Sequence, residues 1–420
     1  MARTNNFRAL SEEFADWLIL KQEEGADTGE IESEAWSAVL SWIGKTESIS
    51  PDATFIENEP NDLETIRALR PKGKRRYPLN LSEDALYDKI LGAWLGRAAG
   101  CILGLPCESM SKEEIRVACK ALGQRYPLNG YWEHDPKPHD AATIHYGVTP
   151  RKNFLRKNLR RIGTDDDLTY TLLGLLILEE YGIDFTSQDV GRAWVQYLPV
   201  ACTAERVVLD NLRRGLEPPD TAMRGNTYRH WIGAAIRSDP WGYAAPGWPE
   251  KAAELAYRDA IISHRGPGLH DAMYFSAVIA LAFVVDDPVE ACRLGLKEIP
   301  KDCWVSRTVK ETLRWCERDC DWDTTTNRIL RKYKGMSGVH CINNAALTIA
   351  GLYYGRKNFG RTIELTVMGG LDTDCTAATA GSILGAVLGA KRIPKKWIDP
   401  LGSTAESYLI GKRIWRSDSI

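Results

Sequence analysis

The sequence predicts an all-α fold, and three observations support this prediction. Apolar residues recur with a period of about 3.6 residues through most of the chain, as expected for helices that bury one face. Two segments, residues 86–104 and 376–390, carry glycines at every fourth position, which places the glycines along one side of a helix. No stretch alternates between apolar and polar residues for long enough to predict a strand. We expect one compact multi-helix domain with minor strands.

The N-terminal residues predict a separate helical appendage. Apolar stripes within residues 7–45 indicate two amphipathic helices. Residues 50–80 are polar, contain proline and end in a basic run at residues 70–76, which is typical of a linker or extended arm. We therefore divide the chain into an appendage and linker, residues 1–80, and a main helical domain, residues 81–420.

Composition limits the classes of partner. The 54 Lys and Arg residues nearly balance the 56 Asp and Glu residues, so no strong field attracts nucleic acid. The N-terminus lacks the apolar core of a signal peptide, and the apolar run 376–390 is too short to span a bilayer. Ten cysteines without paired spacing favour reduced thiols. We expect a cytoplasmic protein with no membrane or nucleic-acid partner, and the oligomeric state stays open.

The first glycine-rich helix leads to a candidate functional carboxylate. Gly92, Gly96, Gly100 and Gly104 recur every four residues, and such a stripe suggests that another backbone comes close. Glu108 follows the end of this helix. It is either a surface residue after the turn at Leu105-Pro106 or a side chain that enters a pocket.

A run of three acids opens the next apolar helix. Asp165, Asp166 and Asp167 precede a segment so apolar that the helix should be buried. Capping of the helix N-terminus, where negative charge interacts favourably with the helix dipole, explains one or two of these acids. Three acids at the start of a buried helix fit metal ligands better.

The third acidic position starts the second glycine-rich helix. Asp372 and Asp374 stand two residues apart, and Gly381, Gly385 and Gly389 follow. Buried carboxylates without partners are costly, so these side chains require cations. Hard oxygen ligands favour Mg²⁺ or Mn²⁺ over zinc.

Other loops offer candidate contacts with a ligand. The segment 226–243, which includes Trp241 and Gly242, is rich in aromatic residues, and it either stacks on a ring or fills the core. His264 ends a helix, as a capping cation or as a ligand contact. The long loop 120–160 has the length of a lid or binding loop. This loop contains His134, His139 and His145. We expect no metal role for these histidines, because their spacing matches no helix face.

Three acidic positions follow one another along the chain, and we call them the acidic stations: Glu108, residues 165–167, and Asp372 with Asp374. Their order resembles that in the ADP-ribosylglycohydrolase family, whose members include the dinitrogenase reductase-activating glycohydrolases. The resemblance covers roughly residues 86–400 and is closest to a bacterial branch with the sequence Asp-Thr-Asp-Cys at residues 372–375. It implies a helical fold with a central cleft for two divalent cations, Mg²⁺ or Mn²⁺. It also implies hydrolysis of an N- or O-glycosidic bond at the anomeric carbon of ribose, in an ADP-ribosylated protein or small molecule.

The resemblance assigns roles residue by residue. It implies metal ligands at Thr164, Asp165, Asp166, Asp372 and Asp374, with Asp167 included if the register shifts by one residue. It implies substrate contact at His264, and we add Trp241 and Gly242 from the aromatic segment. We expect catalytic roles for Glu108, Asp166 and Asp374, with Glu108 as the general base, because a loop carboxylate can reach the attacking water.

Two positions depart from the family pattern. Cys375 replaces the usual threonine, and Cys101 replaces an aspartate in the first helix. A thiol is a poor ligand for magnesium. Four hypotheses remain open: hydrolysis of an ADP-ribosylated substrate, hydrolysis of another ribosylated small molecule or nucleoside, an inactive module that binds ADP-ribose, and a structural helical protein whose acids are only helix caps.

Overall fold

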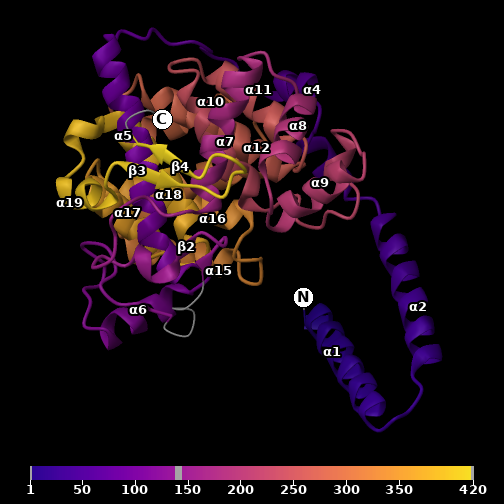
Figure 1. The fold of residues 1–420 in the computed structure, drawn as a ribbon. Helices are drawn as coiled ribbons and strands as arrows, with labels where there is room; N and C mark the ends of the chain where they lie inside the picture. The colour runs from indigo at the N-terminus through magenta and orange to yellow at the C-terminus, as the bar shows by residue number, and fades with distance from the viewer. Residues whose placement is uncertain (1, 138–143, 418–420) are drawn as a thin grey trace. The chain divides into compact units, whose positions relative to one another are not determined.

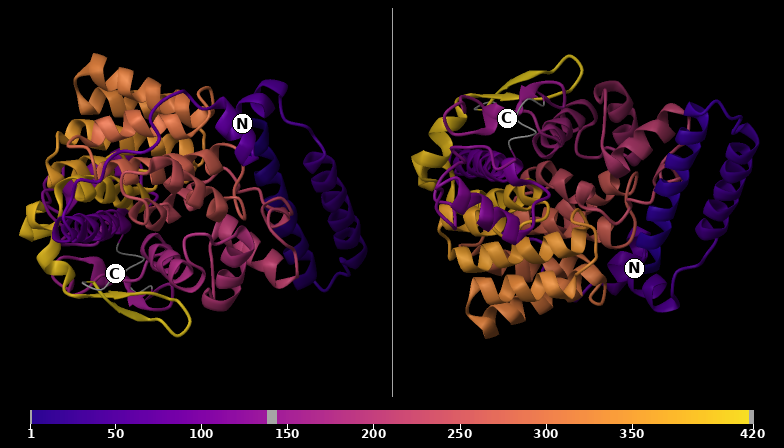
Figure 2. Two further views of the ribbon diagram at one scale, coloured as in Figure 1. Left: turned by 90° about the horizontal axis from the view of Figure 1, so that it is seen from above. Right: turned by 90° about the horizontal axis from the view of Figure 1, so that it is seen from below.

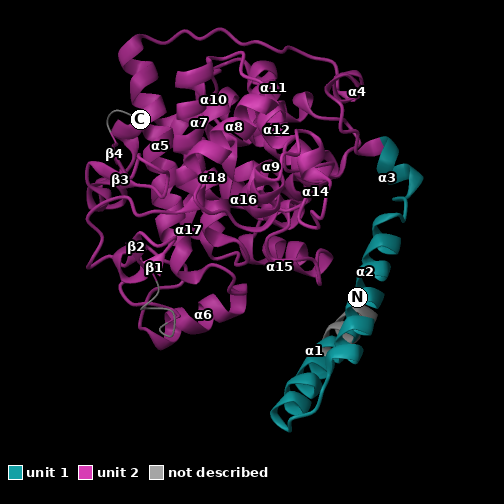
Figure 3. Cartoon of the chain, turned by 45° about the vertical axis from the view of Figure 1, so that its right-hand side comes forward, with its two compact units in different colours: residues 1–57 teal, residues 58–420 magenta. Residues whose placement is uncertain are grey.

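The computed structural model describes residues 2–137 and 144–417, so His139 lies outside the described residues. Contacts divide the chain into two units, residues 1–57 and 58–420 (Figure 3). Helices dominate both units, which confirms the predicted all-α class (Figure 1).

Unit 1 is a helical hairpin. Helix α1 (Ala2–Glu23) is followed by α2 (Gly29–Glu47), and the short helix α3 (Ala53–Asn58) comes at the boundary with unit 2. The ring of Phe7 meets the ring of Trp42 edge-on at 6.2 Å between centroids. The two helices that the sequence predicts in residues 7–45 are confirmed.

The residues that follow the hairpin pack within unit 2. Helix α4 (Leu63–Leu69) buries Ile66 completely. Arg70 forms ion pairs with Glu298 at 2.9 Å and with Glu250 at 3.0 Å, and Arg75 also reaches Glu298 at 3.1 Å. Part of the basic run at residues 70–76 is therefore neutralised by acids of unit 2.

Unit 2 is a layered helical domain whose remaining helices surround a central pair, α5 and α18. The helices that complete it are α5 (Glu83–Gly104), α6 (Lys112–Ala121), α7 (Asp166–Tyr181), α8 (Ser187–Tyr197), α9 (Thr203–Arg213), α10 (Asp239–Tyr243), α11 (Pro249–Ala260), α12 (Pro267–Ala282), α13 (Pro288–Gly295), α14 (Trp304–Asp319), α15 (Trp322–Lys332), α16 (Cys341–Gly355), α17 (Phe359–Val367), α18 (Thr373–Leu388) and α19 (Lys395–Ile398). Figure 2 shows the central pair from above and from below, in purple and yellow.

The glycine stripes of α5 and α18 face each other, so each helix supplies the close backbone that the glycine stripe of the other suggests. A Cβ atom at Gly96 would lie 2.2 Å from the carbonyl oxygen of Gly381, and one at Gly100 would lie 2.0 Å from that of Ala377. The same matching continues from Gly92 to Gly385 in one direction and from Gly104 to Thr373 in the other. The helices are therefore antiparallel and in backbone contact, and the end of α5 meets the start of α18.

Two short antiparallel hairpins make up the strands of the described residues. They pair β1 (Ile144–His145) with β2 (Thr149–Pro150), and β3 (Thr404–Glu406) with β4 (Ile414–Arg416). Among the described residues, the stretch Glu83–Cys107 is long and apolar enough, by length and composition alone, to cross a membrane. Most of that stretch is buried inside unit 2, where it forms the central helix.

Candidate active site

The antiparallel register of α5 and α18 brings the first and third acidic stations together. Glu108 follows a turn of 3₁₀ helix, Leu105–Cys107, at the end of α5. Asp372 occupies the N-cap position of α18 without a capping hydrogen bond from its side chain, and Asp374 lies in the first turn. Carboxylate oxygens of Glu108, Asp372 and Asp374 all lie within 4.8 Å of one another. Glu108 is therefore a pocket residue, half-buried beside two buried aspartates.

The second station lies at the start of α7. Asp165 is the N-cap, and its Oδ1 accepts a hydrogen bond from the backbone N–H of Asp167 at 3.0 Å. Its Oδ2 lies 2.8 Å from Nε2 of His145. Asp165 thus acts as a cap, as the ordinary interpretation expects, and also presents a carboxylate to the site.

One cavity of about 270 Å³ collects these side chains. Glu108, Asp165, Asp166, Asp372 and Asp374 supply its carboxylates, and Glu205 also reaches it. The remaining lining residues are His145, Tyr146, Cys202, Thr203, Trp231, Ile232, Gly233, Ile236, Val339 and Cys375. All three acidic stations of the sequence therefore meet in one place.

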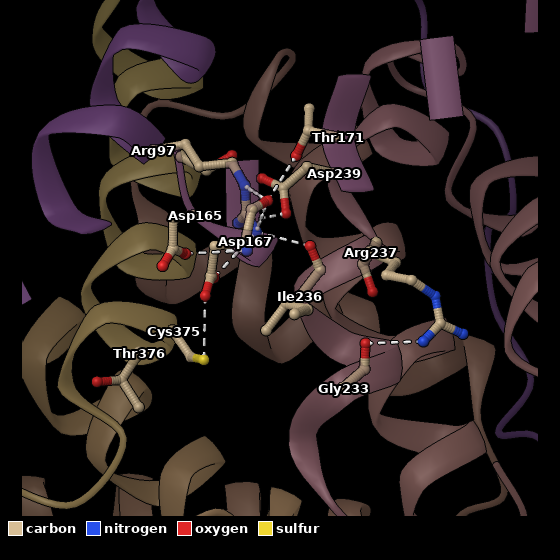
Figure 4. A network of polar contacts seen from close by, with 12 residues as sticks. Arg97, Asp165, Asp167, Thr171, Gly233, Ile236, Arg237, Asp239, Cys375 and Thr376 are labelled. Carbon is tan, nitrogen blue, oxygen red and sulfur yellow. Dashed lines mark hydrogen bonds and ion pairs between the residues drawn. The ribbon is translucent and has the colours of Figure 1, made fainter. Parts of the chain in front are cut away.

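Asp167 points to a different partner. Arg97 is fully buried in α5 and donates from Nη2 to Oδ1 of Asp167 at 3.1 Å and from Nη1 to Oδ2 of Asp239 at 2.7 Å (Figure 4). Cys375 Sγ donates to the other oxygen of Asp167, Oδ2, at 3.1 Å. Asp167 therefore links the two glycine helices to α7, while its carboxylate also lies within 4.8 Å of candidate ligand atoms of Asp165 and Asp166 and of Asp374 and Cys375.

The cavity concentrates negative charge. Two ionised carboxylates within 4.8 Å repel by at least about 3.5 kcal/mol at an effective dielectric of 20. Burial, together with the charges of Asp372 and Asp165, raises the pKa of Glu108 to about 7. Burial and the charge of Glu108 also raise the pKa of Asp374 well above its usual range. In the described part of the lining, His145 is the one basic side chain.

Divalent cations fit this set of residues. Asp374 Oδ1 is buried in the cavity without a hydrogen-bond partner among the described residues, and so is Thr164 Oγ1, although Thr164 precedes Asp165 in sequence and does not itself line the cavity. A buried polar oxygen without a partner is costly, and a cation would satisfy it. The donors are carboxylate and hydroxyl oxygens, which Mg²⁺ and Mn²⁺ prefer. Cys375 already donates its proton to Asp167, so its sulfur is not needed as a ligand.

The structure places the three expected substrate contacts away from the cavity lining. Trp241 is 1% exposed and packs on Phe185 at 4.8 Å between ring centroids. Gly242 lies against Ile279 of α12, so the aromatic segment fills the core at this point. His264 is fully buried with Nδ1 2.7 Å from Oγ of Ser263, and burial lowers its pKa well below the usual range, so it is not a capping cation.

Sequence reasoning missed two residues that shape the site. His145 lies in the long loop that has the length of a lid or binding loop, where we expected no metal role for the histidines, and only the fold brings it to Asp165. Arg97 carried a usable signal, since it is a charged residue within a glycine-striped, otherwise apolar helix and must therefore have a buried partner.

Comparisons with known proteins find relatives that match most of the chain. The sequence profile of the ADP-ribosylglycohydrolase family matches residues 82–418. The ADP-ribosyl-[dinitrogen reductase] glycohydrolase of Rhodospirillum rubrum is 26% identical over 324 residues, which cover 77% of this chain and 93% of that protein. A solved structure, described as an ADP-ribosylglycohydrolase-related protein complex, is 20% identical with a TM-score of 0.49, and the match covers 76% of this chain and 93% of that one.

Proposed function

The chain belongs to the ADP-ribosylglycohydrolase family and is a glycohydrolase, and we propose that it hydrolyses the bond at the anomeric carbon of ribose in an ADP-ribosylated substrate. The bond is N- or O-glycosidic, and the reaction depends on two divalent cations, Mg²⁺ or Mn²⁺. The observation that carries this proposal is the meeting of the three acidic stations in one cavity.

Glu108 is proposed as the general base. It is half-buried at the wall of the cavity, where its carboxylate can reach a water molecule that attacks the substrate. Its backbone carbonyl accepts a hydrogen bond from Lys137 Nζ at 2.7 Å, which holds the loop in place. Glu108 would take a proton from the attacking water as its oxygen bonds to the anomeric carbon.

The overall reaction adds hydroxide to the anomeric carbon and a proton to the leaving nitrogen or oxygen. The breaking glycosidic bond gives its electron pair to the leaving atom, and positive charge develops on the sugar. Asp165, Asp372 and Asp374 are buried at this cavity, and the negative charge that bound cations leave unneutralised would favour the positive charge on the sugar. These side chains thus contribute to catalysis besides any role as ligands.

Thr164, Asp165, Asp166, Asp372 and Asp374 are the residues proposed to hold the cations. Bound cations would supply charge neutralisation, binding of the ribose hydroxyls and a lower pKa for water. Arg97 would position Asp167, and through it Cys375, so that the start of α7 stays fixed against α18.

The size of the cavity supports entry of only part of the substrate. Its volume of about 270 Å³ is just below the usual range of about 300–1,000 Å³ for small-molecule sites. We propose that the ribose and the bond to be cleaved enter, between the carboxylates and the apolar wall of Trp231 and Ile236. The leaving group and the rest of ADP-ribose would lie outside the carboxylate cavity.

A hydrolysis screen tests the proposal. The full chain is incubated with ADP-ribosyl-arginine, ADP-ribosyl-serine, O-acetyl-ADP-ribose and nucleosides, each with Mg²⁺, Mn²⁺ or chelator. We expect release of ADP-ribose from at least one ADP-ribosyl substrate, and loss of that release with chelator. Cleavage of nucleosides alone would replace the substrate class, while binding of ADP-ribose without turnover on any substrate would identify an inactive binding module.

A further inference from the structure

Helices α1 and α2 present an apolar surface that no described residue of unit 1 covers. Twelve large apolar side chains in residues 7–43 are each 40–70% exposed. Five of them are aromatic: Phe7, Phe14, Trp17, Trp36 and Trp42. A surface helix of a monomer normally shows polar residues to water, so this hairpin has the composition of an interface.

The spacing of these residues fits helical partners. Phe7, Leu10, Phe14 and Trp17 follow one another at intervals of three, four and three residues, which is the seam of a coiled coil. In α2, intervals of four and three residues separate Trp36, Leu40 and Ile43. Seams of this kind pack against other helices at a shallow angle, as in a four-helix bundle.

The exposed area is large enough for a stable dimer. The five aromatic side chains, each 40–70% exposed, contribute on the order of 500 Å² of accessible surface. The seven aliphatic side chains add to this, and a standard interface needs about 800 Å² from each partner. The hairpin therefore offers the area of a specific interface.

The charge of the hairpin narrows the choice of partner. Residues 1–57 contain four Lys and Arg residues against twelve Asp and Glu residues, a net charge of −8. Anionic membranes attract helices that are rich in Lys and Arg, so a membrane surface is disfavoured. At 100° per residue, Glu12 and Asp16 lie on the side of α1 opposite Phe7 and Phe14. These two acids of α1 would therefore lie on the outer face of a bundle.

We propose that this hairpin is a homodimerisation element, in which α1 and α2 pack on the same two helices of a second copy to form a four-helix bundle. The two apolar faces are identical, so a two-fold axis pairs them. The acidic outer faces would be separated by about two helix diameters, roughly 20 Å, which exceeds the Debye length of about 8 Å at physiological salt. Repulsion between the acidic faces is therefore screened, while the apolar faces are buried.

Sedimentation velocity of the full chain tests the proposal. The chain has a mass of 47.0 kDa, and we expect a dimer of twice that mass at micromolar concentration. The double variant Leu10→Glu with Leu40→Glu places four carboxylates in the dimer seam, so the dissociation constant should rise at least about 100-fold. Both side chains are more than half exposed within unit 1, so the hairpin itself should fold.

A matched control separates the seam from a general effect of added charge. Val117→Glu in α6 alters a side chain that is 54% exposed, as Leu40 is, and should leave the dimer intact. Circular dichroism checks that all variants keep their helix content. The dimer should persist from 0.05 to 1 M NaCl, because apolar burial and not charge holds it. A monomer at all concentrations, a dimer that survives the double substitution, or dissociation by salt would each overturn the proposal.

Discussion

Substitution of the glycines between α5 and α18 should separate an effect on stability from an effect on the site. An alanine Cβ at Gly104 would lie 2.3 Å from the carbonyl oxygen of Thr373, and ordinary contact begins near 3.4 Å. The helices must therefore move apart by about 1.1 Å at that point. At Gly92 the nearest atoms lie at 2.6 Å, so a shift of about 0.8 Å is needed there.

Both substitutions should destabilise the fold by similar amounts. Overpacking costs about 1–3 kcal/mol, and removal of a helical glycine returns up to about 1 kcal/mol, so the net loss should be about 1–2 kcal/mol. Their effects on catalysis should differ. Gly104 lies four residues before Glu108 and packs against the backbone of Asp374, so a shift at Gly104 would displace both carboxylates. Misplacement of catalytic groups by 1 Å can lower the rate about 100-fold. Gly92 lies twelve residues, or about 18 Å, further along the helix.

Thermal unfolding and kcat on the substrate found by the screen measure these two effects. Gly104→Ala should lower both Tm and kcat, and Gly92→Ala should lower Tm with kcat near that of the unsubstituted protein. Gly130→Ala, in a loop with open space around the glycine, is the control and should change neither. Full activity and an unchanged Tm for Gly104→Ala would refute the backbone contact as the element that positions the site.

Three further predictions concern metal, the thiol and pH. Excess chelator should lower Tm, by the equivalent of about 2.7 kcal/mol if cation is first present at 100 times its Kd, and Asp374→Ala should remove that response in differential scanning fluorimetry. Cys375→Thr should keep a donor to Asp167 and retain stability, whereas Cys375→Val should lose about 1.5–3 kcal/mol in urea unfolding. Burial opposes a charged His270, but Cys303 and Glu59 raise its pKa to about 10. The charged His270 therefore stabilises the fold fully below about pH 6.5, the pKa of histidine in the unfolded chain. This stabilisation, up to a few kcal/mol, is lost as the pH rises through 10. His270→Gln should remove this slope in urea titrations at pH 6, 8 and 10, and the exposed control His134→Gln should not.

The fold was predictable because its main signal is periodic. A glycine at every fourth position has one structural consequence, a close backbone neighbour, and the matching stripe later in the chain identified that neighbour. Once the two helices pack antiparallel, Glu108 at the end of the first helix must lie near Asp374 at the start of the second. The acidic stations could be predicted for the same reason, since each opens or ends a helix too apolar to be exposed.

The rest of the site depended on side-chain direction, which sequence spacing does not determine. Asp165 and Asp167 are two residues apart at one helix start, yet the first faces the cavity and the second faces Arg97. Trp241 lies in an aromatic segment with the composition of a binding loop, but tertiary packing buries it beside α12. His145 comes from a loop whose path the pattern of residues does not specify.

The central claim is that the carboxylate cavity is a hydrolytic metal centre in which Glu108 acts on the attacking water. Parallel measurement of kcat and bound metal in Glu108→Gln and Asp374→Asn tests it most directly. Glu108→Gln should retain metal while kcat falls by about 10²–10⁴-fold with little change in substrate affinity, which is the range of general-base catalysis. Asp374→Asn should lose metal, affinity and turnover together. Full activity of Glu108→Gln, or metal content and turnover unchanged in Asp374→Asn, would contradict the account.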